Sequence, residues 1–506
     1  MDNEYLKTVI AFSSQKGFIW GPEPEIYGGL SGFYTYGPLG KLLKNKVENV
    51  IRDRFVKSDF FEVECPIVMP RPVWEASGHL AGFSDPVLSC SKCEVKVRAD
   101  EFIGEQFPEL KESLRPENIL TVVKEKGLVC PQCQSPFKEE VTKHDLMMKT
   151  TIGIGTEAFM RPETATTTYL PFLRYADFFR NKLPFGVFQI GKAFRNEISP
   201  RQYLLRVREF TQAEGQLFIH PDDKKSYYKF DVISDNVLPL LHKKTEKVEM
   251  LSLKDALATG LIKSKACGWT LDFAYNLFVS FGIPVERIRL RQHRDDEKAF
   301  YADDAWDVEI NLNSFGWTEV CGVHDRTDYD LSQHEKFSKK KLEISLETGK
   351  VKPHVLEIAF GTDRPVFALL DLFYEKKKEE EGKSTLKLPL EIAPVQVGVF
   401  PLFRKDNMPE QATVIADLLK EEYIVKFDET QSIGKRYLRA AEEGIPFCIT
   451  IDYDTLKDKT VTLRDRDSEK QVRLKVDELL PTLRSLFNRL SAFSDLKGAV
   501  ASPKSE

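Results

Sequence analysis

The chain has 506 residues, of which 42% are hydrophobic, and this is enough for two or three domains that each bury a core. Its 73 basic and 78 acidic residues give a net charge of −5, which neither supports nor excludes binding to nucleic acid. The first residues lack a long apolar secretory segment, and no run approaches the roughly 18 apolar residues of a membrane span. We therefore expect a soluble cytoplasmic protein with no membrane partner.

Residues 38–57 predict a long amphipathic helix, because apolar residues recur there at helical spacing with charged residues between them. The helix overlaps the end of a glycine-rich segment, residues 26–40. It is followed by an extended segment, residues 60–70, in which Pro66 suits the edge of a sheet.

Four of the eight cysteines form two Cys-x-x-Cys pairs, Cys90 with Cys93 and Cys130 with Cys133. Two such pairs can present four thiolates to one Zn²⁺, so we interpret residues 84–145 as an insertion resembling a zinc ribbon with a structural zinc site. The interval between the pairs is longer than the usual spacing of about 15–20 residues. Two unrelated reduced pairs, or a ribbon that has lost its metal, are the alternatives. The other cysteines are expected to be small buried residues.

Residues 187–217 predict two strands joined by a polar turn. Residues two apart in a strand share a face, which places Arg195 and Glu197 together. The returning strand has four side chains on one face: Arg208, Phe210, Gln212 and Glu214. Guanidinium groups bind phosphate, an aromatic ring stacks on a purine, and a carboxylate accepts from an exocyclic amine. We interpret the hairpin as part of a nucleotide site; a half-exposed hairpin with charges in water is the alternative.

The middle of the chain predicts a further series of elements. A polar, helix-prone segment at about 220–285 is interpreted as a second insertion. An antiparallel series of strands is then predicted at four segments: residues 287–293, 306–312, 316–323 and 354–361. The last strand runs into an apolar helix.

Arg364 lies in the first turn of this helix, where the positive end of the helix dipole disfavours a cation unless an anion is close. A nucleotide phosphate would supply that anion, and Arg195 would hold it from the opposite side. The alternative is a salt bridge to Asp363 or another surface acid.

Three acids, Glu163, Glu214 and Glu357, lie in structured and partly apolar sequence contexts. Converging carboxylates repel one another unless a cation lies between them, so an ammonium group is the ligand they favour. Each acid alone is more simply a surface or hydrogen-bonded residue. Glu319 offers an oxygen ligand for Mg²⁺, which takes its other ligands from phosphates and water; a solvated strand position is the alternative.

A charged run at residues 375–387 predicts an exposed linker and the main domain boundary. Beyond it, residues 386–490 alternate strands and helices, which predicts an α/β domain with a mostly parallel or mixed sheet. The helix at 434–443 combines basic residues with Tyr437 and suits RNA binding; a solvated helix face is the alternative. We expect residues 491–506 to be a disordered tail.

Together these motifs resemble the class II aminoacyl-tRNA synthetases, and most closely the dimeric glycyl-tRNA synthetase family. Residues 194–197 with 208–210 resemble motif 2 of that class, and the helix at 38–57 with Pro66 resembles motif 1. Other segments resemble the glycine-specific branch, in the same order along the chain: residues 26–29, 77–79, 98–100, 161–165, 325–327, 329–331 and 460–467. The resemblance runs from about residue 5 to residue 485.

The resemblance implies an α+β catalytic domain at residues 1–385, built on an antiparallel sheet of six or seven strands, and a C-terminal α/β anticodon-binding domain. It implies a homodimer formed partly through motif 1. The implied activity is that of an aminoacyl-tRNA ligase, which uses ATP and Mg²⁺ to convert glycine to glycyl-adenylate and transfers it to the 3′ end of tRNA(Gly). The alternative is a non-catalytic synthetase paralogue that binds RNA or acts as a scaffold.

Carried over residue by residue, the resemblance makes Arg195 and Arg364 the catalytic residues, at the α- and γ-phosphates, with Glu197 on the adenine amine and Phe210 on the adenine face. Implied ATP-binding residues are Arg195, Asn196, Glu197, Leu205, Arg206, Val207, Arg208, Glu209, Phe210, Glu319, Val320, Gly361, Thr362, Asp363 and Arg364. Implied glycine-binding residues are Arg98, Glu163, Phe210, Thr211, Gln212, Ala213, Glu214, Glu357, Ile358, Ala359, Phe360 and Gly361. Glu319 is the implied Mg²⁺ ligand.

Three sites depart from the family pattern. Ala359 stands where the family usually has serine, Thr166 and Thr167 stand where it has Gln-Gly, and Gln216 replaces a common acid. Each departure loses a polar or charged group, which would lower glycine affinity by about 1–3 kcal/mol if buried partners go unpaired. Ala359 and Thr166 are the features that favour the non-catalytic alternative.

Overall fold

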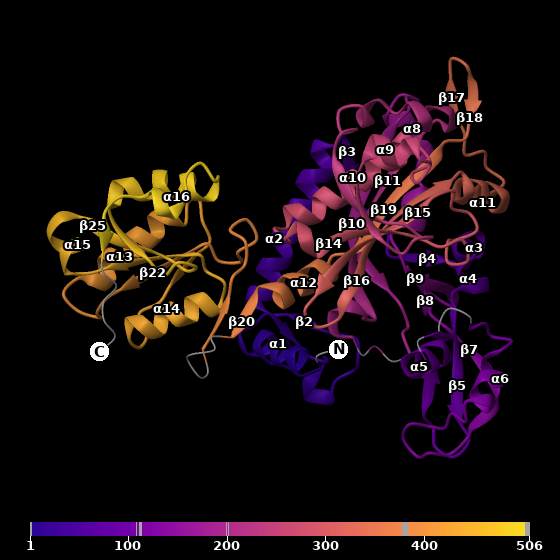
Figure 1. Ribbon diagram of the computed structural model, residues 1–506, viewed down its shortest axis with the longest axis horizontal. Helices are drawn as coiled ribbons and strands as arrows, with labels where there is room; N and C mark the ends of the chain where they lie inside the picture. Colours follow the sequence, from indigo (N-terminus) through magenta and orange to yellow (C-terminus); the bar gives the residue numbers. More distant parts are fainter. Residues whose placement is uncertain are drawn as a thin grey trace.

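The computed structural model describes residues 3–107, 109–110, 114–198, 200, 202–376 and 383–500. They form a large N-terminal domain, a small cysteine-containing unit that extends from it, and a C-terminal α/β domain at the other end of the long axis (Figure 1). Within these described ranges, no helix is both long enough and apolar enough to cross a membrane.

The large domain is built on a nine-stranded sheet in the order β13-β12-β14-β15-β16-β19-β11-β10-β3. Neighbouring strands are antiparallel except at β12–β14 and β10–β3. The sheet is therefore wider than the six or seven strands that we expected. The strand bounds are β3 Phe60–Glu62, β10 Phe185–Phe194, β11 Glu209–Ile219, β12 Val237–Leu241, β13 Val248–Ser252, β14 Ile288–Gln292, β15 Ala305–Leu312, β16 Gly316–Thr327 and β19 His354–Gly361.

Residues 220–285 account for part of this width and are not an insertion beside the sheet. They supply the edge strands β12 and β13, then α9 (Leu253–Ala258) and α10 (Lys265–Ser280). Most residues of α10 are buried, and the helix contacts β14, β15, β16 and β19. A helix that is buried on most of its surface lacks a clear polar stripe, which is why its sequence signal was weak.

The helix predicted at 38–57 is α2, which begins at Pro38 and ends at Lys57. Pro38 fits the first turn, where its missing N–H has no intrahelical partner. The side chains of Leu43, Val47 and Phe55 are buried in the core of the large domain. Near its start, Gly40 allows close contact with the preceding loop, because a Cβ there would lie 1.8 Å from the carbonyl oxygen of Phe18.

Shorter elements surround the sheet. The other helices of this domain are α1 Asn3–Gln15, α3 Arg71–Ala76, α4 His79–Gly82, α7 Ala165–Tyr169, α8 Phe172–Phe178, α11 Tyr329–Ser338 and α12 Asp363–Phe373. Small sheets pair β1 Ile19–Trp20 with β2 Thr35–Tyr36, β4 Val68–Pro70 with β9 Thr156–Met160 and β8 Met148–Ile152, and β17 Ile344–Leu346 with β18 Gly349–Val351.

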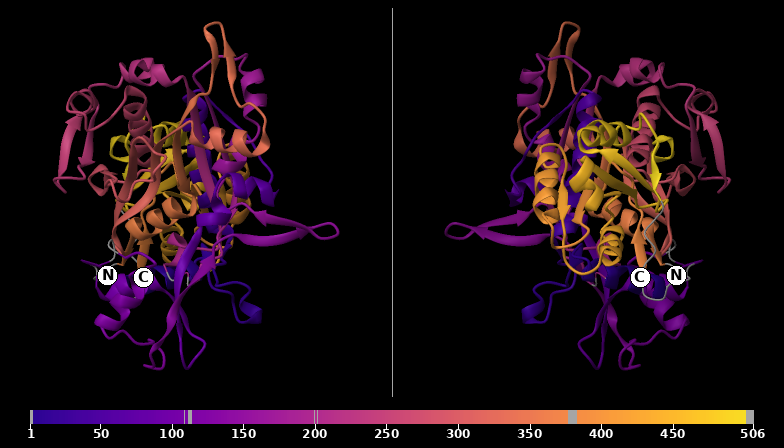
Figure 2. Two further views of the ribbon diagram at one scale, coloured as in Figure 1. Left: turned by 90° about the vertical axis from the view of Figure 1, so that its right-hand side faces the viewer. Right: turned by 90° about the vertical axis from the view of Figure 1, so that its left-hand side faces the viewer.

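The segment predicted as an insertion at 84–145 forms a separate unit with its own hydrophobic core. Its three-stranded sheet has the order β6-β5-β7 and packs against two short helices. The unit lies at the end of the large domain opposite the β17–β18 hairpin (Figure 2). Its elements are β5 Ser84–Cys90, β6 Lys96–Arg98, β7 Phe137–Asp145, α5 Ala99–Gln106 and α6 Ile119–Glu125.

The C-terminal domain has a six-stranded sheet in the order β23-β22-β24-β25-β26-β27. The first three strands are parallel and the others antiparallel, which confirms the predicted mixed sheet. The bounds are β22 Val397–Pro401, α13 Met408–Leu419, β23 Val425–Phe427, α14 Ile433–Glu442, β24 Phe447–Ile451, α15 Tyr453–Asp458, β25 Thr460–Asp465, β26 Gln471–Lys475, α16 Leu479–Phe487 and β27 Ala499–Val500.

Two boundary expectations differ from the structure. Residues 491–500 are not a disordered tail, because β27 pairs with β26; residues 501–506 lie outside the described residues. The charged linker is flanked by paired strands, β20 Tyr374–Lys376 and β21 Ser384–Leu386, and residues 377–382 lie outside the described ranges. Leu388 and Ile392 still belong to the core of the large domain, so the boundary falls after 385.

Candidate active site

A cavity of about 640 Å³ opens over the main sheet and is lined from the β10–β11 hairpin to the start of α12. Part of its floor is a row of residues in register across four strands: Glu214 on β11, Ala359 on β19, Gly322 on β16 and Asp307 on β15. The two small residues in the middle of the row leave space between the acids at its ends.

The three acids singled out in the sequence meet in this cavity. Glu163, Glu214 and Glu357 all line it, and Glu214 and Glu357 are almost fully buried. Glu214 accepts a hydrogen bond of 2.5 Å from the Thr164 hydroxyl, and Glu357 accepts one of 3.0 Å from Tyr169. We call this group of three carboxylates the acid end of the cavity.

One buried arginine provides part of the countercharge at the acid end. Nη1 of Arg326 donates to Glu357 at 3.2 Å, while Nε and Nη2 donate to Asp330 at 2.7 and 2.8 Å. Asp330 and Glu357 thus share one cation, whose charge also acts on Glu163 and Glu214 at the acid end. The acid end retains excess negative charge.

The pKa values of the acids follow from this arrangement. Burial, together with the charges of Glu357 and Glu163, raises the pKa of Glu214 to about 8. Burial alone would raise the pKa of Glu357, but Arg326 and His324 hold it below its usual value. Burial would also raise the pKa of Glu163, but the charges of His79 and Arg326 outweigh burial and lower this pKa strongly. An ammonium ligand would neutralise the remaining charge.

The other end of the cavity is lined by arginines. Nε of Arg195 donates to the carbonyl oxygen of Pro162 at 3.1 Å, and its guanidinium lies 5.4 Å from the ring centroids of both Phe83 and Phe210. Among the described residues, Arg195 has no carboxylate partner. Two aromatic rings therefore hold a cation whose charge is available to an anionic ligand. We call this region, with Arg364, the arginine end.

Arg364 binds Glu319, a half-exposed acid of the cavity wall, so the predicted alternative of a salt bridge is confirmed for another surface acid and is wrong for Asp363. Nη1 of Arg364 donates to the carbonyl oxygen of Glu319 at 2.7 Å and to its Oε1 at 3.3 Å. Asp363 is buried and is held instead by Lys44 at 2.7 Å and by the backbone N–H of Thr211 at 2.9 Å.

The half-exposed carboxylate of Glu319 also offers the kind of oxygen ligand that Mg²⁺ prefers. It lines the cavity beside Arg364, at the end where phosphates would bind. One or two carboxylates are enough for this ion when phosphates and water supply the remaining ligands.

A network of opposite charges lies at the rim of the arginine end. Arg206 donates to Glu197 at 2.7 Å and also contacts Glu101. Arg98, expected among the glycine ligands, donates to Asp100 at 2.7 Å and lies 3.4 Å from Asp85. It therefore lines the cavity in the network around Arg206, away from the three acids.

Not every implied site residue lines the cavity. Arg208 does not lie on the cavity face where we expected it, because it precedes β11. Its guanidinium donates to the carbonyl oxygens of Glu197 and Ser31 and so fixes the hairpin loop. Thr211, Ala213 and Ile358 alternate with lining residues of their strands and do not line the cavity. The implied residues outside the lining are Asn196, Arg208, Glu209, Thr211, Ala213, Ile358 and Thr362.

Several lining residues carried no sequence-based role. They include Phe83, Asp85, His293, Tyr301, Asp307, Gly322, His324 and Arg326. Asp307 is an acid in the middle of a strand that is buried along most of its length, and such a position was a usable signal. Arg326 likewise stands in a largely buried strand with Asp330 four residues later, but its contact with Glu357 on another strand could not be predicted from the sequence.

The three departures from the family pattern have different surroundings. The Thr166 hydroxyl donates to Glu163 at 2.9 Å, and Thr167 accepts from Arg161, so both threonines take part in the polar network. Gln216 is fully buried, and among the described residues neither atom of its amide group has a hydrogen-bond partner. Ala359 lies in the cavity floor beside Gly322.

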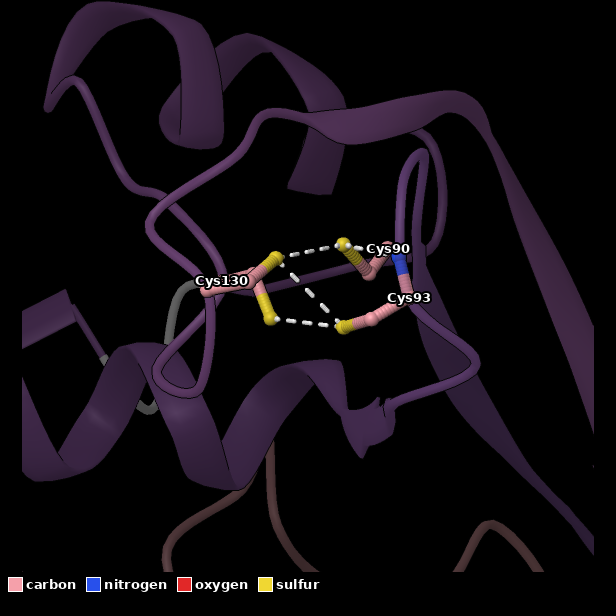
Figure 3. Close-up of side chains that lie close together, drawn as sticks. Cys90, Cys93 and Cys130 are labelled. Carbon is pink, nitrogen blue, oxygen red and sulfur yellow. Dashed lines mark hydrogen bonds between the residues drawn. The ribbon is translucent and has the colours of Figure 1, made fainter.

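The four cysteines of the small unit converge (Figure 3). Sγ–Sγ distances are 3.4 Å between Cys90 and Cys133 and 3.6 Å between Cys93 and Cys130. Tetrahedral Zn²⁺ with Zn–S bonds of about 2.3 Å separates its sulfurs by about 3.8 Å. Hydrogen bonds from Ser135 lower the pKa of Cys133 to about 6, whereas at Cys93 a backbone hydrogen bond is outweighed by burial and the neighbouring thiols, which raise the pKa to about 12. The donor set and its spacing fit zinc.

The basic and aromatic residues of α14 have structural partners within the C-terminal domain. Arg436 is buried and donates to the carbonyl oxygens of Pro401 and Gln431. Arg439 binds Asp428 at 2.6 Å. Lys435 is exposed, and Tyr437 is partly buried. Of the basic and aromatic residues Lys435, Arg436, Tyr437 and Arg439, only Lys435 is therefore exposed.

Comparisons with known proteins agree with this architecture. Residues 153–373 match the tRNA synthetase class II core domain (G, H, P, S and T), and residues 396–486 match an anticodon binding domain. A Giardia lamblia prolyl-tRNA synthetase, solved with prolyl-adenylate, superposes with a TM-score of 0.60 at 15% identity, over 94% of this chain and 75% of that one. At this identity, the likeness concerns the fold alone.

Curated relatives extend over nearly the whole chain. The glycine–tRNA ligase of Methanococcus maripaludis is 36% identical over 94% of this chain and 98% of its own length. Those of Methanocaldococcus jannaschii and Pyrococcus furiosus are each 36% identical over 96% of this chain, and 99% and 98% of their own lengths are covered. The chain therefore belongs to the glycine–tRNA ligase family of class II tRNA synthetases.

Proposed function

We propose that the protein is a glycine–tRNA ligase, which activates glycine with ATP to glycyl-adenylate and transfers the glycyl group to the 3′ end of tRNA(Gly). The observation that carries this proposal is the pairing, in one cavity, of an acid end suited to an ammonium group with an arginine end suited to phosphates. The names of the relatives, which match over their full length, support the same activity.

Glycine would bind with its ammonium group among Glu163, Glu214 and Glu357. Arg326 donates to one oxygen of Glu357, and the Tyr169 hydroxyl donates to the other. A pocket packed closely onto the glycine Cα would reject a larger amino acid by steric overlap. Selection by size is then steric, whereas a larger pocket would gain only about 1–3 kcal/mol per methylene group.

ATP would bind at the arginine end, with its α-phosphate at Arg195 and its γ-phosphate at Arg364. Phe210 supports the adenine face, and Glu197 accepts from its amine. Glu319 would hold Mg²⁺, which neutralises phosphate charge when it is bound. Arg364 must then exchange its contact with Glu319 for one with the nucleotide, as both groups line the same cavity.

In the first step, a carboxylate oxygen of glycine attacks the α-phosphorus of ATP. The bond from this phosphorus to the bridging oxygen breaks, and pyrophosphate leaves with the electron pair. No side chain has to deprotonate the nucleophile, because it is already a carboxylate. Positioning and charge stabilisation by Arg195 and Arg364 therefore provide most of the catalysis. In the second step, the terminal hydroxyl of the tRNA attacks the glycyl carbonyl and AMP leaves.

The non-catalytic alternative is favoured by Ala359 and Thr166, and the buried amide of Gln216 beside Glu357 adds to it because it has no hydrogen-bond partner among the described residues. A protein that only binds RNA has no need for Arg195, Glu319 and Arg364 in one cavity. Glycine-dependent exchange of pyrophosphate into ATP distinguishes the two functions. We expect exchange with glycine and none with alanine, and a folded protein without exchange would refute the ligase activity.

We further propose that the four thiolates hold a structural zinc ion. The backbone N–H groups of Lys92 and Cys93 both donate to Sγ of Cys90 at 3.4 Å, an arrangement that stabilises a thiolate. Elemental analysis should find zinc in the wild type, and Cys133→Ser should lose it. All eight cysteines are free thiols, which suits a reducing cytoplasmic location.

A homodimer built partly on motif 1 is supported by exposed aromatic residues at the sheet edge. Phe61 on the edge strand β3 is 50% exposed, and Phe178 is 65% exposed and packs against it edge-to-face with centroids 5.5 Å apart. Sedimentation should show a dimer that Phe61→Glu weakens. Phe300→Glu, at an 83% exposed position away from this edge, should leave the dimer intact.

A further inference from the structure

Three side chains of types that bind metal ions meet in the cavity wall, and the proposed reaction gives none of them direct contact with glycine or ATP. His293 follows β14, Asp307 lies on β15 and His324 lies on β16. One ligand atom from each lies within 4.8 Å of the other two. Apart from the four thiolates, this is the only such group found within the described ranges.

His293 pairs with Asp307 in a geometry that leaves its Nε2 without a well-aligned hydrogen bond to any described residue. Its Nε2 is buried and lies 2.9 Å from Oδ2 of Asp307, yet among the described residues it makes no hydrogen bond of acceptable geometry. A buried nitrogen whose contact with a carboxylate is poorly aligned is not fully satisfied, and a ligand between the two groups would satisfy it. A cation shared with Asp307 would satisfy both groups.

Asp307 is already fixed in position by a neighbouring cation. Arg291, its register partner on β14, forms an ion pair with the same carboxylate. The arginine orients the carboxylate and offsets part of its negative charge. Metal affinity at this place must therefore come largely from the two imidazoles.

His324 is oriented for metal binding by an acid and by a glycine. Its Nδ1 lies 3.4 Å from Oε1 of Glu357. Its ring leans over Gly322, where a Cβ would lie 2.6 Å from Cε1 and 3.2 Å from Nε2, and Gly322 is the register partner of Asp307. Metal-bound histidines usually have one ring nitrogen held by a carboxylate or carbonyl, which leaves the other nitrogen for the metal.

We propose that His293, Asp307 and His324 form a second divalent-cation site, suited to a borderline transition ion such as Zn²⁺. Two imidazoles and one carboxylate favour this class of ion, whereas Mg²⁺ prefers oxygen ligands alone. Three protein ligands leave a fourth position open, and all three residues line the cavity, so a water or substrate atom can occupy it. The site is separate from the four thiolates and from Glu319.

Equilibrium dialysis of the full-length protein against Zn²⁺, followed by elemental analysis, tests the site without any assay of activity. His324→Ala and His293→Gln should each bind one zinc ion fewer per chain than the wild type, or bind it at least about tenfold more weakly. His220→Ala, which changes a histidine outside the cavity lining, should bind as the wild type does. Unchanged zinc binding in both site variants would overturn the proposal.

Anomalous diffraction from wild-type crystals soaked in Zn²⁺ gives a second result that does not depend on the folding of a variant. We expect one peak among the four thiolates and another between His293 and His324. Occupied thiolates without a second peak would contradict the site. This result also leaves the ligase proposal untouched, so the two can fail separately.

Discussion

The two ends of the cavity hold their charges in opposite ways. At the acid end, Glu214 and Glu357 are almost fully buried and each is fixed by hydrogen bonds from Thr164 or Tyr169. At the arginine end, Arg195 lies between aromatic rings, and Arg364 is paired with the half-exposed Glu319. The acid end is thus rigid before a ligand arrives, which suits selection of a small substrate, while the arginine end can rearrange around phosphates.

The largest effect is expected at the arginine end. Arg195→Ala removes the cation that would stabilise the α-phosphate, so kcat/KM for glycine-dependent pyrophosphate exchange should fall by at least about 10³-fold. Lys192→Ala is the matched control, because Lys192 lies on the same hairpin and pairs with Glu209 outside the cavity. Near-normal exchange in Arg195→Ala with an intact fold would contradict its role.

The next largest effect should show that the two ends of the cavity bind different substrates. Glu357→Gln removes a buried charge at the acid end, so KM for glycine should rise about 10–100-fold, as expected for the loss of a charge-assisted hydrogen bond. KM for ATP should change little. Glu335→Gln, which alters an acid paired with Lys341 away from the cavity, should change neither. Equal increases in both KM values would show that the ends are not independent.

A smaller effect should depend on pH. The pKa of Glu214 is raised from 4.5 to about 8, so the free protein holds a proton there at neutral pH, and an ammonium ligand must expel it. KM for glycine should therefore fall as pH rises towards about 8, by up to tenfold per unit. Glu214→Gln should flatten this dependence; a wild-type KM that is independent of pH over this range would refute the assignment.

The raised pKa of Glu214 also determines how the free energy of unfolding changes with pH. The unfolded chain loses the Glu214 proton near pH 4.5, whereas the native protein keeps it until about pH 8. The contribution of Glu214 to the free energy of unfolding therefore decreases as pH rises between these values and is level above them. Denaturant unfolding of the wild type and of Glu214→Gln across this range would measure it.

The smallest effect concerns Gln216, next to the acid end. Its buried amide has no hydrogen-bond partner among the described residues, so Gln216→Met should increase the free energy of unfolding by about 1 kcal/mol. Gln189→Met is the contrasting variant, because the Gln189 amide binds Arg161 and Thr164, and it should be destabilised. Destabilisation of both variants would indicate that Gln216 has a partner, such as a bound water.

The sequence could predict those features of the fold and of the cavity that depend on residues close together in the chain, and it could not predict contacts between distant segments. The helix at 38–57 and the hairpin that carries Arg195 follow from local periodicity, and both form where predicted. The acids of the cavity could be chosen as candidates because each stands in an apolar context. The hydrogen bonds that Glu357 accepts from Arg326 and Tyr169 could not be predicted, because these residues lie 31 and 188 positions away from it in the sequence.

Two expectations met side chains that already have partners within the protein, for related physical reasons. Arg208 was placed on the cavity face by strand alternation, but β11 begins one residue later, so the alternation does not extend to it. Arg436 and Tyr437 were considered for RNA because they are basic and aromatic, yet their partners are carbonyl oxygens and a hydroxyl of neighbouring segments. Local sequence indicates which groups carry charge, and only the fold determines which of those charges are already paired.

Glycine-dependent exchange of pyrophosphate into ATP by the wild-type protein tests the central claim most directly, with alanine and serine as matched substrates. We expect exchange with glycine and none above background with the two larger amino acids, because a pocket packed onto the glycine Cα would reject them by overlap. Equal exchange with alanine would contradict steric selection at the acid end, and no exchange with glycine by the folded protein would contradict the proposed function itself.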